Sequence, residues 1–389
     1  MRTIFILSLI GHLTGPIAVT SYIYPISNCN TYDLFNHTKM TRGCLILCCY
    51  AGILFASISP VKGLIKPPKK YIVNLDVEPE KRWQEVALDH TFLIKDIQSI
   101  VTSVIPKDIL PYIELIATDI DYYLPKPYAG EMRGFAKALN ISVGDIVMTN
   151  LIYDVSAFCT SIISQDDKGQ IWHSRNLDYP FTGILENITI AVDFQSRGQT
   201  VYSVVTYAGY IGALTGQRPN VFTVTVDERD QGSIIWNLVI GILDKNVVPV
   251  SFLVRDALAN DTTFEAAINR LSYTPTAADA YFIMGGVKPG EGAVITKGRL
   301  APDDVWRLDP ANGRWFLVET NYDHWTPPPP NDNRRDPAIK AISSLGQANI
   351  TVMNLFNVMS TPKVLNSDTT YTVVMSAAKP SLMQTWIRD

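Results

Sequence analysis

Beyond its first 50 residues the chain is almost without cysteine, and this scarcity excludes two kinds of site. Four of the five cysteines lie in those 50 residues, so the rest of the chain holds Cys159 alone. One cysteine can build neither a disulfide framework nor a cysteine-based zinc site. Cys159 is therefore either a small buried hydrophobe or a reactive thiol.

Basic clusters and metal-binding histidine patterns are missing as well. The densest basic stretch, "KPPKK" at 66–70, is typical of a solvated linker, and the net charge is −4. We therefore expect no nucleic-acid partner. The five histidines are isolated and none stands in an HExxH pattern. We expect no metal and no cofactor.

The amino-terminal region is typical of a secretory signal. "MTRGCLILCCYAGILFASISP" begins at Met40, with a charge at Arg42 and an apolar core from Cys44 to Ala56. This core is short for a membrane-spanning helix. We interpret residues 1–60 as an upstream extension and a signal peptide, with Met40 as the functional start. The mature chain is then expected to enter the secretory route.

Four N-glycosylation sequons in the body of the chain agree with that route. Each has an asparagine followed two residues later by serine or threonine. We expect a glycoprotein with candidate sites at Asn140, Asn187, Asn260 and Asn349.

The chain up to residue 158 is predicted to be mostly helical. Apolar residues recur every three or four positions over 83–105 and 114–124. The segment 142–158 begins with Ser142 and has Asp145 three residues later, which resembles a capping box. These helices favour core packing, with part of the surface of residues 83–123 as a candidate lipid contact.

From Cys159 onward the pattern changes to strands. The predicted strands are rich in β-branched and aromatic residues and lie at 159–164, 170–179, 188–195, 200–209, 221–230, 280–285, 292–296, 314–320 and 370–376. Helices are predicted at 234–259, 263–271, 336–345 and 351–360. This order indicates an α/β (α+β) protein in which helices pack on the faces of a largely antiparallel sheet.

The stretch "CTSIISQDDKGQIWHSRNLDY" carries the chemistry. Its "QDDKG" is a turn signal between two extended segments. A turn at 166–169 places Cys159 across from Arg175 or Asn176. A guanidinium beside a thiol lowers the pKa of the thiol. Asp178 is then placed either to orient Arg175 or to bind an ammonium group.

The base that takes the thiol proton has two possible sources. One is a histidine, but spacing places neither His173 nor His324 beside Cys159. The other is the α-amino group of Cys159 itself, which is available only after the preceding peptide bond is cut.

Three motifs, "CTSIISQDDKGQIWHSRNLDY", "DERDQG" and "ETNYDHW" followed by "NRR", resemble the acid ceramidase and N-acylethanolamine-hydrolysing acid amidase family over residues 70–389. The resemblance implies an amino-terminal-nucleophile hydrolase with a four-layer αββα sandwich. It implies self-cleavage between Phe158 and Cys159. The products are a helical α chain (61–158) and a catalytic β chain (159–389), which stay together as one folded unit.

The resemblance also implies the roles of single residues. Cys159 is the nucleophile and its freed amine is the base. Asn321 helps to form the oxyanion hole, where an amide donor suits the developing charge. The other active-site residues that the motifs imply are Arg175, Asp178, Glu228 and Arg334.

The family hydrolyses lipid amides in the lysosome. The lone Cys159 rules out a disulfide between the two chains, a link that the ceramidase branch has, so we favour N-acylethanolamines with saturated acyl chains. The sequence departs from the family pattern at Ser174, where glycine is usual. Three alternatives stay open: an acid ceramidase, a non-enzymatic lipid-binding relative and a papain-like thiol hydrolase. We expect a membrane or micelle surface as a further partner.

Overall fold

The computed structural model describes residues 66–93, 107–153, 158–179, 182–229, 243–244 and 246–388. The predicted upstream extension and signal peptide, residues 1–60, lie outside these ranges. So do residues 94–105 and 234–242, which belong to segments predicted to be helical.

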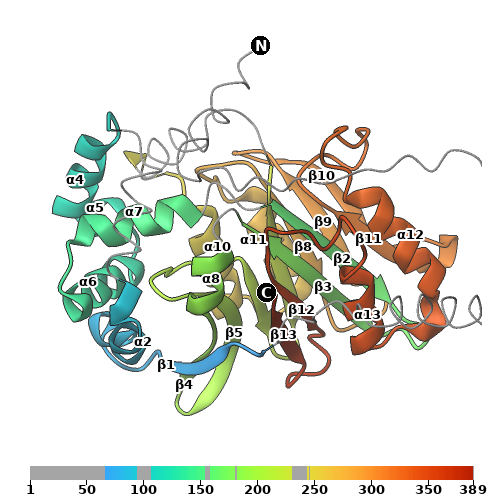
Figure 1. Cartoon of the computed structure of the whole chain (residues 1–389), viewed down its shortest axis with the longest axis horizontal. Coiled ribbons are helices and arrows are strands. Elements are labelled where there is room, and N and C mark those ends of the chain that lie inside the picture. The colour runs from blue at the N-terminus through green and yellow to red at the C-terminus, as the bar shows by residue number, and fades with distance from the viewer. Residues whose placement is uncertain are drawn as a thin grey trace, which may run out of the picture. The chain divides into compact units, whose positions relative to one another are not determined.

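Two β-sheets form the centre of the fold (Figure 1). The larger sheet consists, in spatial order, of β1 (Lys69–Asn74), β4 (Thr189–Ser196), β5 (Gln199–Tyr207), β6 (Thr215–Arg218), β7 (Phe222–Glu228), β8 (Ala280–Gly285), β9 (Gly292–Lys297) and β10 (Pro302–Arg307). The smaller sheet consists of β11 (Phe316–Glu319), β2 (Phe158–Gln165), β3 (Ile171–Asp178), β12 (Thr369–Met375) and β13 (Met383–Ile387).

The two sheets pack face to face. β2 and β3 lie against β7, β8 and β9, and an apolar cluster that includes Ile163, Ile283 and Val294 fills one part of the space between them. The side chains of a strand alternate between its two faces, so Cys159, Ser161 and Ile163 share the inner face of β2. The site is therefore built between the sheets.

Helices cover both outer faces. α12 (Arg335–Leu345) and α13 (Val352–Met359) pack on the smaller sheet, and α10 (Val250–Asn260) and α11 (Phe264–Tyr273) pack on the larger one. Further helices are α2 (Gln84–Asp89), α4 (Leu110–Thr118), α5 (Ile120–Tyr123), α6 (Tyr128–Leu139), α7 (Val143–Tyr153) and α8 (Thr182–Ile188). The predicted αββα layering is confirmed.

The start of α7 has the reciprocal hydrogen bonds that the sequence predicts. The amide of Asp145 donates to Ser142 Oγ (3.0 Å), and the amide of Ser142 donates to Asp145 Oδ2 (3.2 Å). These bonds satisfy two of the amides that a helix start leaves without partners. The helix ends earlier than predicted, however, because Phe158 already belongs to β2.

The part before residue 158 is not wholly helical. β1 pairs with β4, and this is the one parallel pair among the described strands; all other described strand pairs are antiparallel. Since β4 lies beyond Cys159, the first part of the chain supplies an edge strand to a sheet built by the second part.

Candidate active site

The β2–β3 hairpin brings Cys159 and Arg175 together. Gly169 adopts a positive φ of 85°, and Asp166 Oδ1 accepts hydrogen bonds from the amides of Lys168 and Gln170. The predicted turn is thus confirmed, because its residues supply a left-handed position and a side-chain acceptor.

The predicted register of this hairpin is wrong by one to two residues. Cys159 lies opposite Leu177, and Arg175 lies opposite Ser161. Arg175 is two residues from Leu177 and therefore on the same face as Cys159, as a diagonal neighbour. A long guanidinium side chain spans that diagonal, so the predicted contact forms in spite of the register.

The thiol of Cys159 is fully buried beside the guanidinium. Arg175 Nη2 lies 2.8 Å from Cys159 Sγ and also donates to the carbonyl of Val226 (2.8 Å). Arg175 Nη1 donates to the carbonyl of Leu214 (2.6 Å) and to Thr215 Oγ1. No carboxylate among the described residues forms an ion pair with Arg175. The buried cation therefore faces a group that gains charge only when the thiol ionises.

The surroundings of this thiol favour its protonated form. Burial raises the pKa of Cys159 well above its ordinary value, and the charge of Arg175 opposes the rise only in part. Thiol activation therefore requires a change that weakens the effect of burial or strengthens that of Arg175.

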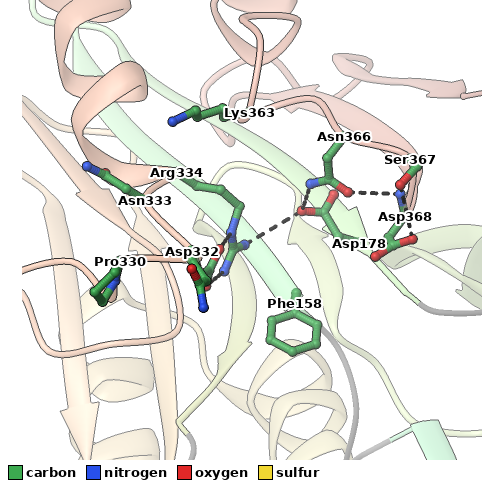
Figure 2. A pocket seen from close by; sticks show the side chains of 11 residues that line it. Phe158, Asp178, Pro330, Asp332, Asn333, Arg334, Lys363, Asn366, Ser367 and Asp368 are labelled. Carbon is green, nitrogen blue, oxygen red and sulfur yellow. Dashed lines mark hydrogen bonds and ion pairs between the residues drawn. The ribbon is translucent and has the colours of Figure 1, made fainter. Parts of the chain in front are cut away.

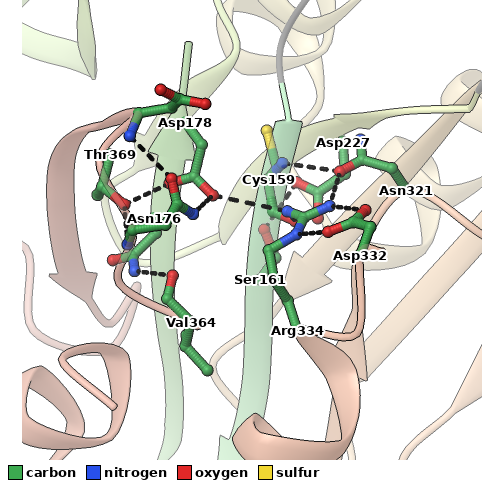
Figure 3. Close-up of polar contacts among 12 residues, drawn as sticks. Cys159, Ser161, Asn176, Asp178, Asp227, Asn321, Asp332, Arg334, Val364 and Thr369 are labelled. Carbon is green, nitrogen blue, oxygen red and sulfur yellow. Dashed lines mark hydrogen bonds and ion pairs between the residues drawn. The ribbon is translucent and has the colours of Figure 1, made fainter. Parts of the chain in front are cut away.

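The backbone of Cys159 is held from the other side by Asn321 and Arg334 (Figure 3). The amide of Cys159 donates to Asn321 Oδ1 (2.8 Å), and Arg334 Nη1 donates to the carbonyl of Cys159. Arg334 Nη2 also donates to Asn321 Oδ1 (2.8 Å). Two donors meet at this atom, which fixes it as the amide oxygen.

The amide nitrogen of Asn321 points away from Cys159. It donates to the main-chain carbonyl of Glu228 (2.8 Å), at the end of β7. Asn321 thus accepts from the main-chain nitrogen of Cys159 through its oxygen and donates to Glu228 through its nitrogen. Its role as an oxyanion donor stays a prediction, as does that of the half-buried Glu228 side chain.

Asp178 pairs with Arg334 and not with Arg175. It lies opposite Phe158, its carboxylate is 3.6 Å from Arg334 Nη1, and it accepts hydrogen bonds from Thr369 Oγ1 (2.6 Å) and Asn366 Nδ2 (2.8 Å). Burial raises the pKa of Asp178 to about 6. The structure therefore gives no support to the prediction that Asp178 orients Arg175.

Arg334 links these groups. It stands at the start of α12, and Asp332 binds it through two hydrogen bonds, from Nε (2.6 Å) and Nη2 (2.7 Å). This bidentate pair fixes the plane of the guanidinium. Its carbon Cζ lies 5.8 Å from the centre of the Phe158 ring, so Arg334 spans the Phe158–Cys159 peptide bond.

A polar cavity of about 510 Å³ opens in front of that bond (Figure 2). Phe158, which is 48% exposed, forms one wall, and Asp178 and Arg334 form another. The remaining lining residues are Pro330, Asn331, Asp332, Asn333, Lys363, Asn366, Ser367 and Asp368. The Phe158–Cys159 peptide bond thus runs from an exposed residue beside this cavity to a buried thiol.

Sequence analysis did not identify three buried polar residues beside the site, Ser161, Thr225 and Asp227. His173, which it considered only as a base for the thiol, is buried next to Thr225. Ser161 Oγ lies 2.8 Å from Asp227 Oδ1 and 2.9 Å from Thr225 Oγ1. The alternation in "TVTVD" contains the signal, because positions 223, 225 and 227 must share one face of their strand.

No histidine among the described residues contacts the thiol. His173 binds Thr223 and Thr225, and His324 stacks on Trp306 with 4.3 Å between ring centres. A papain-like pair of cysteine and histidine is therefore not formed here. In the described part of the chain, no group of three or more His, Cys, Asp or Glu residues is arranged to hold a metal ion.

Two family models match the chain. One is described as the beta subunit of N-acylethanolamine-hydrolyzing acid amidase and matches residues 66–124, within the segment that we name the α chain. The other is described as linear amide C-N hydrolases of the choloylglycine hydrolase family and matches residues 159–349.

Named relatives match most of the chain. The N-acylethanolamine-hydrolyzing acid amidase of Rattus norvegicus is 45% identical over 83% of this chain and 89% of its own. The acid ceramidase of Homo sapiens is 36% identical over 82% and 86%. A solved structure of a Caenorhabditis elegans N-acylethanolamine-hydrolyzing acid amidase ortholog is 40% identical, with a TM-score of 0.55 over 59% of this chain and 100% of its own. The chain belongs to the family of N-acylethanolamine-hydrolyzing acid amidases and acid ceramidases, which are amidohydrolases of linear amides.

Proposed function

We propose that this chain is an acid-active lipid amidase that hydrolyses N-acylethanolamines, such as palmitoyl-ethanolamide, to a fatty acid and ethanolamine. One observation carries the proposal: the Cys159 thiol lies 2.8 Å from a buried guanidinium, while Asn321 holds the adjacent nitrogen. The acid amidases among its relatives share more identity with the chain than the ceramidases do, 45% against 36% for the two described above.

The enzyme activates itself by cutting the Phe158–Cys159 bond. Cys159 Sγ attacks the carbonyl carbon of Phe158, the carbon–nitrogen bond breaks, and the thiol proton ends on the nitrogen of Cys159. Water then hydrolyses the thioester, which frees the thiol and leaves a carboxylate on Phe158. The match of the linear-amide hydrolase model begins at Cys159, which supports a chain that starts there.

After the cut, the same groups serve the substrate. Cys159 is the nucleophile, its free amine is the base, and Asn321 holds that amine by its oxygen. Arg175 stabilises the thiolate, and Asp178 and Arg334 position the main chain around it. Glu228 anchors Asn321 through its main-chain carbonyl. The polar cavity suits the ethanolamine end of the substrate better than its acyl chain.

The substrate is reached at a lipid surface inside the lysosome. Leu88, Phe92, Leu110 and Leu115 are exposed apolar side chains on or between α2 and α4, within the predicted lipid contact. Each buried methylene contributes about 0.8 kcal/mol, so long-chain amides stay in membranes or micelles. In the described residues, no helix has the length and apolar character needed to cross a bilayer. Asn140, Asn187, Asn260 and Asn349 are exposed, which suits glycosylation on the secretory route.

The test compares wild type with Cys159→Ala, each acidified and then run on a denaturing gel. We expect wild type to give two chains, with Cys159 at the start of the second by amino-terminal sequencing, and the variant to stay whole. The cut protein is then assayed on palmitoyl-ethanolamide and on ceramide. A single wild-type band that binds lipid without turnover would establish the non-enzymatic alternative, and faster ceramide hydrolysis would establish the ceramidase.

A further inference from the structure

A chain of buried hydrogen bonds runs between the two sheets and ends beside the nucleophile. It joins side chains of β2, β3 and β7, each at most 1% exposed. Its five contacts are Gly285 O to Thr223 Oγ1 (3.2 Å), Thr223 Oγ1 to His173 Nδ1 (2.9 Å), His173 Nε2 to Thr225 Oγ1 (3.0 Å), Thr225 Oγ1 to Ser161 Oγ (2.9 Å), and Ser161 Oγ to Asp227 Oδ1 (2.8 Å).

The five hydrogen bonds of this chain need one proton more than its side chains carry when His173 is neutral and Asp227 is ionised. Each hydrogen bond needs one proton, and a carbonyl oxygen can only accept. The Thr223 hydroxyl must therefore donate to Gly285, so His173 Nδ1 must donate to Thr223. Three hydroxyls and a neutral imidazole supply four protons for five hydrogen bonds. The fifth proton must lie on either Asp227 or His173.

The fifth proton is more stable on Asp227 than on His173. Its Oδ2 has no hydrogen-bond partner among the described residues, so an ionised carboxylate would be fully buried with a single hydrogen bond. A neutral acid is far cheaper to bury than an ion. Burial raises the pKa of Asp227 to about 7, whereas burial and the charge of Arg175 lower the pKa of His173 to about 3. Below about pH 7, the proton is on Asp227.

Charged groups face Asp227 from several elements. Arg175 on β3 and Arg334 before α12 favour its ionised form, and the Ser161 hydroxyl does so too. Asp178 on β3 opposes ionisation, and Asp227 in turn raises the pKa of Glu319 on β11. Tyr281 is its neighbour on β8. Burial outweighs the two cations.

We propose that Asp227 is a positioning residue of this reaction: kept neutral by the hydrogen-bond chain to His173, it leaves the charge of Arg175 to the thiolate of Cys159. When Asp227 loses its proton, its negative charge disfavours the thiolate. This inference rests on the proposed function, and it explains why the proposed amidase is active at acidic pH.

Two variants test it by shifting the pH profile in opposite directions. In Asp227→Asn the side-chain amide donates to Ser161 as the protonated acid does, and it never ionises. We expect self-cleavage at acidic pH to stay near the wild-type rate. The alkaline limit, which is the pH above which the rate falls, should rise by about one pH unit or more, so that cleavage near neutral pH is about tenfold faster or more. Loss of cleavage at every pH would make Asp227 an ionised base and overturn the proposal, as would an unchanged profile.

Thr225→Val keeps the shape of the side chain but cuts the hydrogen-bond chain. Ser161 is then free to donate to an ionised Asp227, so the extra proton is no longer needed. We expect the alkaline limit to fall below that of wild type, and this variant decides the question if Asp227→Asn does not fold. An unchanged limit would contradict the proton count. Asp261→Asn, which makes the same change at a buried carboxyl that pairs with Arg270 after α10, is the matched control and should leave the profile unchanged.

A measurement independent of cleavage separates this inference from the proposed function. Cys159→Ala and its double variant with Asp227→Asn are compared by infrared spectroscopy. We expect the single variant to show one protonated-carboxyl band at acidic pH that the double variant lacks, and to lose it on titration through about pH 7. Absence of that band at acidic pH would overturn the role of Asp227 even if the wild-type chain cleaves itself.

Discussion

At the scale of single residues, the centre of the site is a buried cation without a carboxylate partner among the described residues. Through its two Nη atoms Arg175 donates to main-chain carbonyls, to Thr215 and to the sulfur of Cys159. A buried charge is costly unless it is compensated. The charge of Arg175 is therefore costly while the Cys159 thiol is protonated, and formation of the thiolate would offset that cost.

We predict that Arg175→Gln slows self-cleavage at least tenfold while the protein stays folded. Glutamine keeps hydrogen-bond donors in place but removes the positive charge, so the thiol ionises less readily. Cleavage is followed on gels and folding by circular dichroism. Lys340→Gln, which removes an exposed lysine on α12, is the control for loss of one positive charge. Wild-type rates for Arg175→Gln would refute the thiolate role.

We predict that Asn321→Ala slows hydrolysis by the cut enzyme by about 100- to 1000-fold, the usual loss for one oxyanion donor. Asn321→Asp separates the two functions of this side chain. It keeps an oxygen that accepts from the nitrogen of Cys159 but loses the amide donor. Substrate turnover is compared in both variants after cleavage. If Asn321→Asp retains most of the activity, holding the amine matters more than oxyanion donation.

The residues around the thiol divide into those that sequence could predict and those that it could not. Cys159 and Arg175 belong to one hairpin, so short-range spacing brings them together. Asn321 and Arg334 reach the site from more than 160 residues away, and only the family resemblance pointed to them. Asp227 was missed because "DERD" reads as a solvated charge run until the packing of β7 against β2 is known.

At the scale of elements, the strands that could be predicted have a clear local sequence pattern. The strands that were missed have a weak pattern or depend on a partner far along the chain. β2, β3, β8 and β9 have strong β-branched patterns next to turn signals and were predicted. The sequence did not predict β6, β10 and β13, although each pairs with a strand next to it in the chain, because their segments TGQR, PDDVWR and MQTWI have few β-branched residues. β1 was taken as part of a helical region because its pairing partner, β4, lies more than 100 residues further along the chain.

We predict that α4 carries the lipid contact. The double variant Leu110→Glu with Leu115→Glu should lose the stimulation of hydrolysis by anionic vesicles, because two charges on an exposed apolar surface oppose contact with lipid. Hydrolysis of a soluble short-chain amide should be unchanged. Met353→Glu, at an equally exposed apolar position on α13, is the control (52% exposed against 46% for Leu115). Equal vesicle stimulation in all three proteins would exclude this role.

At the scale of the whole molecule, a buried ionic network ties the α chain to the β chain. Glu131 on α6 is fully buried and binds Arg255 on α10 through two contacts (2.6 and 3.2 Å). It also accepts from Arg82 (3.0 Å) and from the indole of Trp83 (2.7 Å). Cys159 is the one free cysteine among the described residues, and it is buried. The described contacts between the chains are thus non-covalent apart from the 158–159 bond.

We predict that Glu131→Gln destabilises the protein by about 3–5 kcal/mol, because the buried guanidinium of Arg255 and the partly buried one of Arg82 lose their counter-charge. After cleavage its two chains should separate on size-exclusion chromatography under conditions in which the wild-type chains stay together. Glu80→Gln removes an exposed partner of Arg133 and should have little effect. Chains that stay together in Glu131→Gln would show that other contacts are sufficient.

We predict that the difference in stability between Asp227→Asn and its parent increases with pH, with both proteins made in the Cys159→Ala background. Between about pH 4 and pH 7 the unfolded parent has lost the proton of Asp227, while the folded parent keeps it because burial raises this pKa to about 7. The parent therefore loses free energy of unfolding as pH rises, and the asparagine variant does not lose this part. Melting temperatures measured across this range check the trend; a constant difference would contradict it.

The strand β1 gives the proposed cut a consequence for how the molecule can be rebuilt. Before the cut, β1 and β4 belong to one polypeptide, and unfolding and refolding are first-order events. After the cut, the edge of the larger sheet is supplied by a separate polypeptide, so recovery of the native state becomes a second-order association that slows on dilution. The proposed cut then makes the enzyme active but makes its unfolding harder to reverse. A cut molecule that loses its α chain in a dilute compartment does not readily regain it.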